Sequence, residues 1–263
     1  MDFLSLIKPL SIEEFTAKVL AHDTFVMRGG GHRDFSDLLS LEEIEVALNN
    51  GCNVNVPVEV IGNGVRQALV DQNVAWSRIA LRKKEVKALL EAGHSFLMMN
   101  MSQINPKVSA VIDAIESRFD GARADLHLYV SPTNDGTGYH AHRDLPQHKI
   151  YLQVIGNTSW EIFDHSADLP REAINVAAAD EARYLTKVME FDLEPNDVLY
   201  MPPGRFHKVR NHHGPRVSFS IPFVVNLNGK LGRMDRTHIP FRAIFEGARR
   251  EASGGSPQGR ETP

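Results

Sequence analysis

The first part of the chain alternates amphipathic segments with short apolar runs, a pattern that predicts helices connected to buried strands. Ser11 and Ser40 each precede a glutamate by three residues, which is the spacing of a capping box at a helix N-terminus. Asn105 and Pro106 suit the N-cap and first position of a third helix. Between these segments, TFVM and HSFLMM favour strands, so we expect a mixed lead-in over residues 1–121.

Residues 122–225 have a different texture, because short β-rich runs are separated by Gly, Pro, Asn and Asp. The runs are ADLHLYV, HKIYLQVIG, SWEIF, KVMEFDL, DVLYMPP, HKVRN and RVSFSIPFVV. Their spacing predicts a β-sandwich or barrel as the core of the protein, with the lead-in packed on it. We expect residues 226–250 to be helical and the polar, turn-rich residues 251–263 to be disordered.

Composition narrows the class of protein without identifying its chemistry. An apolar fraction of 42% and a charged fraction of 24% are ordinary for a soluble globular protein. The net charge of −4 gives no general attraction to nucleic acid or anionic membranes. We recognise no signal peptide and no membrane-spanning run. The single cysteine, Cys52, excludes an internal disulfide and fits a reducing compartment, so we expect a cytoplasmic protein whose oligomeric state is open.

His142 and Asp144 lie two residues apart, just before a long run of alternating apolar residues. In an extended segment such residues face the same way, about 7 Å apart along the chain. An imidazole and a carboxylate there can converge on one metal ion through bonds of about 2.0–2.2 Å. The triplet alone is not specific, because His32 and Asp34 repeat it in a loop where the aspartate or a nearby serine would simply cap.

His207 is the candidate third ligand. It follows the strand VLYM and a Pro-Gly turn at Pro203 and Gly204, which directs the chain into the next strand. Two histidines and a carboxylate form a facial triad that leaves positions open and suits non-haem Fe(II) and O₂ chemistry. The alternative is that His207 is a turn histidine bonded to the backbone.

The order of these motifs resembles the cupin-type JmjC family of Fe(II)- and 2-oxoglutarate-dependent oxygenases, which includes bacterial ribosomal oxygenases. The resemblance rests on His-x-Asp, then Gln153, Gly156 and Trp160 in Gln-x-x-Gly-x-x-x-Trp, then DVLYMPPGRFH, over about residues 122–223. It implies an α+β fold with a double-stranded β-helix (cupin, jelly-roll) core. It also implies that 2-oxoglutarate chelates the iron and that O₂ is consumed. We recognise no counterpart of the C-terminal dimerisation and winged-helix parts of ribosomal oxygenases, which weakens transfer of their substrate.

The anchor for the far carboxylate of 2-oxoglutarate departs from the family. JmjC enzymes commonly use a Lys two residues after the motif glycine, where this chain has Thr158. Arg216 and Ser218, on one face of their strand, resemble the Arg-x-Ser anchor of the other large 2-oxoglutarate oxygenase branch. Lys149 is the second candidate cation, and we favour Arg216. Tyr129 would contact the co-substrate or substrate if its polar strand face points inward; an outward, solvated orientation is the alternative.

Three functions of different classes follow. The first is a hydroxylase that acts on an amino-acid side chain, free or within a peptide or protein. The second is a metal cupin, a dioxygenase or isomerase, that does not use 2-oxoglutarate. The third is a non-catalytic cupin binding module. The expected partner is therefore a small molecule, a peptide or a protein rather than a membrane or nucleic acid.

Overall fold

The computed structural model describes residues 2–50, 58–62, 65–68, 70–71, 80–103, 105–119, 122–132 and 139–225, with 240, 242–243 and 246. The chain divides into two compact units, Met1–Arg233 and Met234–Pro263, and the first contains the strands of both sheets and the candidate site. The predicted helical segment at 226–250 lies mostly outside the described residues, and the predicted tail at 251–263 lies entirely outside them. The proposed division into lead-in, core, helical segment and tail stays a prediction.

Three helices begin where the capping signals at Ser11, Ser40 and Asn105 predict. The helices are α1 (Phe3–Ile7), α2 (Ile12–Leu20), α3 (Leu41–Asn50), α4 (Lys83–Glu91), α5 (Pro106–Arg118) and α6 (Glu181–Tyr184), with a 3₁₀ turn at Met101–Gln103. The hydroxyls of Ser11 and Ser40 each accept a hydrogen bond from the backbone N–H of the glutamate three residues on. The carboxylate of that glutamate in turn accepts from the backbone N–H of the serine. Asn105 caps α5 by accepting from the N–H groups of Lys107 and Val108. No described helix is long and apolar enough to cross a membrane.

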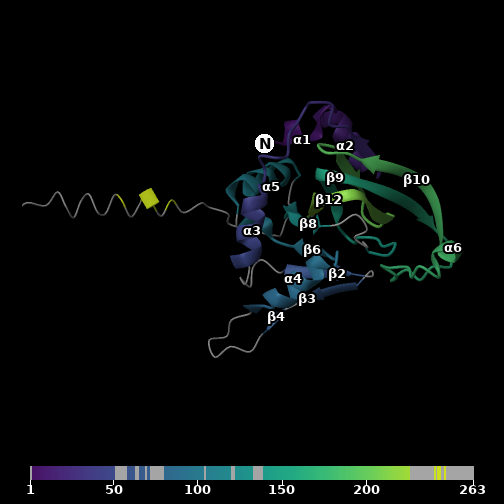
Figure 1. Cartoon of the computed structure of the whole chain (residues 1–263). Helices are drawn as coiled ribbons and strands as arrows, with labels where there is room; N and C mark the ends of the chain where they lie inside the picture. The colour runs from purple at the N-terminus through teal and green to yellow at the C-terminus, as the bar shows by residue number, and fades with distance from the viewer. Residues whose placement is uncertain are drawn as a thin grey trace, which may run out of the picture. The chain divides into compact units, whose positions relative to one another are not determined.

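One antiparallel sheet carries most of the strands (Figure 1). The strands are β1 (Phe25–Met27), β2 (Val58–Gly62), β3 (Val65–Ala68), β4 (Val70–Asp71), β5 (Ala80–Leu81), β6 (Ser95–Met98), β7 (Arg123–Ala124), β8 (His127–Ser131), β9 (His148–His165), β10 (Leu185–Leu193), β11 (Val198–Met201) and β12 (Phe206–Val224). Their order is β1-β11-β9-β12-β8-β6-β2-β3; β10 also pairs with β9, β7 pairs with β12, and β4 and β5 pair separately. The lead-in strands β1, β2, β3 and β6 therefore extend the sheet of the core.

Strands β9 and β12 are each continuous where the sequence predicts separate short strands. Turn-forming residues interrupt both runs, but they lie at bends inside the strands rather than in loops between them. Gly156 has φ +72° within β9, and the register of β12 shifts between His212 and Val217. His212 and His213, which lie between the predicted strands HKVRN and RVSFSIPFVV, consequently belong to β12. These bends let two long strands curve, as the ribbons of Figure 1 show.

Gly156 also allows a close approach between the two long strands. A Cβ at this position would lie 2.4 Å from the carbonyl oxygen of Pro215, directly before Arg216. We expect Gly156→Ala to lower the free energy of unfolding by at least about 1–3 kcal/mol, because strain at positive φ is added to this overlap. Urea denaturation measures the change.

Gly31→Ala is the matched control, because Gly31 has φ +75° but no atom within 4 Å of the added Cβ. The control isolates backbone strain from the overlap with Pro215. If both variants lost the same free energy, the close approach at Gly156 would contribute nothing.

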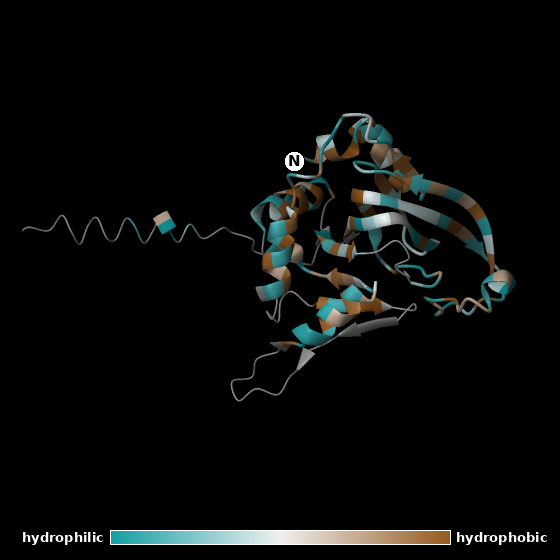
Figure 2. Cartoon of the chain, viewed as in Figure 1, coloured by the Kyte–Doolittle hydropathy of each residue, from teal (hydrophilic) through white to brown (hydrophobic). Residues whose placement is uncertain are grey.

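Alternation along β9 separates an apolar face from a polar one. Ile150 and Leu152 are fully buried in the large core cluster, which also contains side chains of α1, α2 and α5. Lys149, Tyr151 and Gln153 are also buried, although they alternate with these apolar residues. Figure 2 shows the corresponding mixture of hydrophobic and hydrophilic positions along the long strands. The packing therefore buries a row of polar side chains on the other face of the strand.

Candidate metal centre

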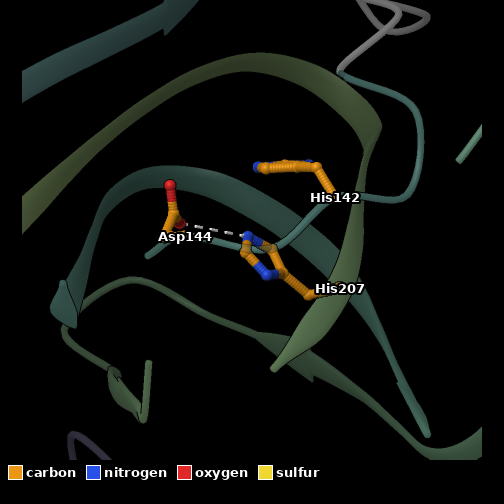
Figure 3. Close-up of side chains that lie close together, drawn as sticks. All are labelled: His142, Asp144 and His207. Carbon is orange, nitrogen blue, oxygen red and sulfur yellow. Dashed lines mark ion pairs between the residues drawn. The ribbon is translucent and has the colours of Figure 1, made fainter. Parts of the chain in front are cut away.

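Candidate ligand atoms of His142, Asp144 and His207 all lie within 4.8 Å of one another (Figure 3). A reciprocal backbone pairing brings the histidines together: the N–H of His142 donates to the carbonyl of His207 at 3.0 Å, and the reverse bond is 2.8 Å. The two ring centroids are 4.3 Å apart. Gly204 N–H donates to the carbonyl of Asp144 at 2.8 Å, so the Pro-Gly turn also ties the two segments together. Three residues from two separate segments thus meet, as the motif order predicts.

Both imidazoles are oriented by their Nδ1 atoms. His142 Nδ1 lies 2.9 Å from the carbonyl oxygen of His140, and His207 Nδ1 lies 3.1 Å from that of Arg205. A hydrogen bond from Nδ1 leaves the Nε2 lone pair for a metal. Burial lowers the pKa of His142 and is the main reason that the pKa of His207 falls to about 3. Both rings are therefore neutral at neutral pH, the form that binds metal.

The carboxylate of Asp144 is ionised. Burial acts to raise its pKa, but the positive charge of Lys149 is the largest of the effects that oppose burial, and the net result is a lowered pKa. Its Oδ2 lies 3.9 Å from His207 Nε2, the contact drawn in Figure 3. Because His207 is neutral, this contact is not an ion pair. A carboxylate oxygen and an imidazole lone pair face a common space, an arrangement that a metal cation satisfies.

A cavity extends from the two histidines to Arg216, a half-buried residue whose Nε atom is fully buried. The cavity is lined by Ile61, Ser95, Tyr129, Ser131, Tyr139, His142, Tyr151, Trp160, His207, Val209, Arg216 and Ser218. The buried Nε of Arg216 has no hydrogen-bond partner among the described residues, and its guanidinium carbon is 6.0 Å from the Tyr129 ring centroid. Burial lowers the pKa of Arg216 to about 10, so it remains a cation at neutral pH. A buried cation with an unused donor favours an anionic ligand in this cavity.

Comparison with known families identifies the domain. A protein-family model described as "JmjC domain" matches residues 98–230, just over half of the chain. The chain belongs to the JmjC domain family. The cupin-type α+β fold predicted from the sequence is thereby confirmed for the JmjC domain.

The proteins that are similar to this chain in sequence include a named hydroxylase and a named oxygenase. A bifunctional lysine-specific demethylase and histidyl-hydroxylase NO66 from Culex quinquefasciatus is 26% identical over 224 residues, covering 80% of this chain and 32% of the relative. Ribosomal oxygenase 1 from Homo sapiens is 22% identical over 217 residues, with the same coverage. The chain thus spans about a third of the length of these relatives.

Solved structures share the fold at low sequence identity. The X-ray structure of YcfD from E. coli has a TM-score of 0.58 and 17% identity, covering 97% of this chain and 61% of the other. A structure of YcfD described as a ribosomal oxygenase in complex with cobalt and 2-oxoglutarate has a TM-score of 0.56 and 16% identity, covering 97% and 60%. These likenesses support the fold of the JmjC domain.

The Gln and Trp of the JmjC-like motif form a buried network next to the cavity. Ser218 Oγ and Thr158 Oγ1 donate to Gln153 Oε1 at 2.8 and 3.1 Å, and Trp160 Nε1 donates to Thr158 at 3.0 Å. Gln153 Nε2 donates to two carbonyls of its own strand. Ser218 and Tyr129 line the cavity, so the inward orientation of Tyr129 is the one observed, whereas Thr158 is not among the described lining residues. Its hydroxyl helps to position Gln153 and Trp160.

Lys149 lies beside Asp144 rather than in the described lining of the cavity. Its Nζ is 3.4 Å from Asp144 Oδ1, and it is not among the described cavity-lining residues. It is also buried, so it is not a solvent-facing charge at the edge of the sheet. Tyr151 is a site residue that the sequence motifs do not identify, and its hydroxyl is 3.3 Å from His207 Nε2. A sequence signal for Tyr151 is its spacing of two residues from Lys149, which places both side chains on the same face of the strand.

The second His-x-Asp triplet has a structural role. His32 is exposed, and Asp34 Oδ1 accepts from the N–H of Ser36 at 2.9 Å. Arg33 between them is buried and donates to several backbone carbonyls, including that of Asn196 at 2.8 Å. Within the described part of the chain, this triplet does not gather a third ligand, in contrast to His142 and its partners.

Proposed function

We propose that this JmjC protein is an Fe(II)- and 2-oxoglutarate-dependent hydroxylase of an amino-acid side chain, free or within a peptide or protein. One observation carries the proposal. Two neutral imidazoles and an ionised carboxylate converge beside a cavity that also contains a buried guanidinium with an unused donor. A site for a divalent cation and a site for an anion would therefore share one cavity.

His142, Asp144 and His207 would hold the iron. Their donor set of two nitrogens and one oxygen fits Fe(II) and leaves adjacent coordination positions open. When bound, Fe(II), 2-oxoglutarate and O₂ together supply an oxidant that converts a substrate C–H into an alcohol, with succinate and CO₂ as co-products. The protein's own contribution is to hold the three ligands in place and to keep both imidazoles neutral.

Arg216 would bind the far carboxylate of 2-oxoglutarate, with Ser218 and Tyr129 as polar neighbours in the same cavity. A guanidinium can donate two parallel hydrogen bonds to a carboxylate, which compensates for removing both charges from water. The Ser218 hydroxyl donates to Gln153 Oε1 in the unliganded protein, so it would have to rotate away from Gln153 to donate a hydrogen bond to the co-substrate carboxylate. The unused Nε–H of Arg216 is the strongest sign of an anion site.

The names of the relatives support this class of reaction. They include a histidyl-hydroxylase and a ribosomal oxygenase, and a YcfD structure contains cobalt and 2-oxoglutarate. Because the chain spans only about a third of the curated relatives, we propose the substrate only as a class: a small molecule, a peptide or a protein. We further propose that the protein acts in the cytoplasm.

Anaerobic titration with Fe(II) and then 2-oxoglutarate tests the proposal. We expect a weak visible charge-transfer band that needs both additions, and succinate formation when O₂ is admitted. Metal binding without that band or succinate would instead favour a cupin that does not use 2-oxoglutarate. Failure to bind stoichiometric metal after reconstitution would favour a non-catalytic binding module.

A further inference from the structure

The two oxygens of Asp144 have different surroundings. Oδ1 lies 3.4 Å from the Lys149 ammonium, whereas Oδ2 lies 3.9 Å from His207 Nε2 and 3.5 Å from the Tyr151 hydroxyl. Oδ2 therefore faces the candidate metal position and Oδ1 faces a cation. Lys149 and Tyr151 are two residues apart on β9, and only 6% and 9% of their surfaces are exposed.

The different neighbours of the two Asp144 oxygens affect how this carboxylate can bind a metal ion. A carboxylate can bind a cation through one oxygen or through both, and binding through both uses an additional coordination position. Turning Oδ1 of Asp144 towards the ion would break its pairing with Lys149 in a buried environment. Breaking a buried ion pair is costly because it leaves an uncompensated charge. The pairing therefore opposes binding through both oxygens.

Tyr151 contacts the metal-facing side of the same carboxylate. Its hydroxyl lies 3.3 Å from His207 Nε2 and 3.5 Å from Asp144 Oδ2. Two ligands at right angles around an ion, each bonded at about 2.0–2.2 Å, lie about 3 Å apart, so the phenol is at the edge of the coordination sphere. Its ring packs 4.5 Å from Trp160, which stacks on His207 at 5.7 Å. This packing holds the hydroxyl beside Oδ2.

We propose that Lys149 and Tyr151 are positioning residues that hold Asp144 as a one-oxygen metal ligand. Lys149 retains Oδ1, and Tyr151 donates a hydrogen bond that keeps Oδ2 directed at the ion. Three coordination positions then stay open for the co-substrate and O₂. This inference rests on the proposed function and assigns to Lys149 a task different from anchoring 2-oxoglutarate.

Co(II) is the probe, because the position and intensity of its visible bands report coordination number. The variants are Lys149→Met, Lys149→Arg and Tyr151→Phe, each first checked for an unchanged melting transition. Lys208→Met is the matched control, because Lys208 makes a partly buried ion pair with Glu181 at 2.8 Å. Spectra are recorded with Co(II) alone and with 2-oxoglutarate added, and both affinities are measured.

We expect Lys149→Met to change the Co(II) bands and to weaken Co(II) binding about 10- to 100-fold, the range for loss of an outer partner of a metal ligand, and to weaken 2-oxoglutarate binding because the ion loses an open position. Lys149→Arg restores the cation and should recover the parent spectrum. Tyr151→Phe should weaken Co(II) binding by about 10-fold or more. Lys208→Met should match the parent in every measurement.

A variant at Lys149 or Tyr151 that keeps the parent spectrum and both affinities would show that the role assigned to that residue is wrong. His142→Ala separates this result from failure of the proposed function. If His142→Ala loses the Co(II) bands while both positioning variants behave like the parent, only the inference fails. If His142→Ala keeps the parent bands, the metal site itself is wrongly assigned.

Discussion

Arg216→Met is expected to weaken 2-oxoglutarate binding by about 100-fold or more without changing metal affinity. Removing one partner of a buried charge pair costs about 3–5 kcal/mol, and each 1.4 kcal/mol corresponds to about tenfold in affinity. Methionine has a similar length but no donor. The buried Nε of Arg216 has no partner among the described residues, so removing this atom leaves none of those residues without a hydrogen bond to it.

Calorimetric titration of 2-oxoglutarate into Mn(II)-loaded protein measures this effect. Arg210→Met is the matched control, because Arg210 lies on the same strand, is half exposed and pairs with Glu161 at 3.3 Å. The control should bind 2-oxoglutarate as the parent does. Equal affinity in Arg216→Met and the parent would remove Arg216 as the anchor and favour a cupin that does not use the keto acid.

His142→Ala is expected to weaken metal binding by more than about 100-fold and to abolish succinate formation. Loss of an outer partner typically costs 10- to 100-fold, and loss of a ligand should exceed that. The side chain is only partly buried and its strand-like pairing with His207 uses backbone atoms, so the variant should fold. Fe(II) binding and succinate release are the measurements.

His32→Ala provides an internal control for this prediction. His32 is the first residue of the other His-x-Asp triplet, and it is exposed in a segment whose aspartate caps a turn. We expect this variant to bind Fe(II) and release succinate like the parent. Loss of metal in His32→Ala, with retention in His142→Ala, would reverse the assignment of the two triplets.

The metal centre could be predicted because its ligands follow from local rules. Asp144 follows His142 by two residues in an extended segment, and Gly204 can adopt the positive φ of 78° that the turn before His207 requires. Capping residues such as Ser11 predicted helix starts equally well. In each case the determining interactions lie within a few residues of one another along the chain.

Other features depended on tertiary packing. The bends at Gly156 and before Val217 keep β9 and β12 continuous, although glycine, asparagine and proline usually end strands. The position of Lys149 beside Asp144 depends on how the segment between them folds back, which alternation alone does not determine. Sequence reasoning identified the correct strand face but not the partner of each side chain on it.

A crystal structure of the protein with Mn(II) and 2-oxoglutarate tests the central claim most directly. The result we predict is one ion bonded at about 2.0–2.2 Å to Nε2 of His142, Nε2 of His207 and a single oxygen of Asp144, with the far carboxylate of 2-oxoglutarate on Arg216. An ion bound elsewhere, or a keto acid that does not reach both the ion and Arg216, would contradict the assignment as an oxygenase of this class.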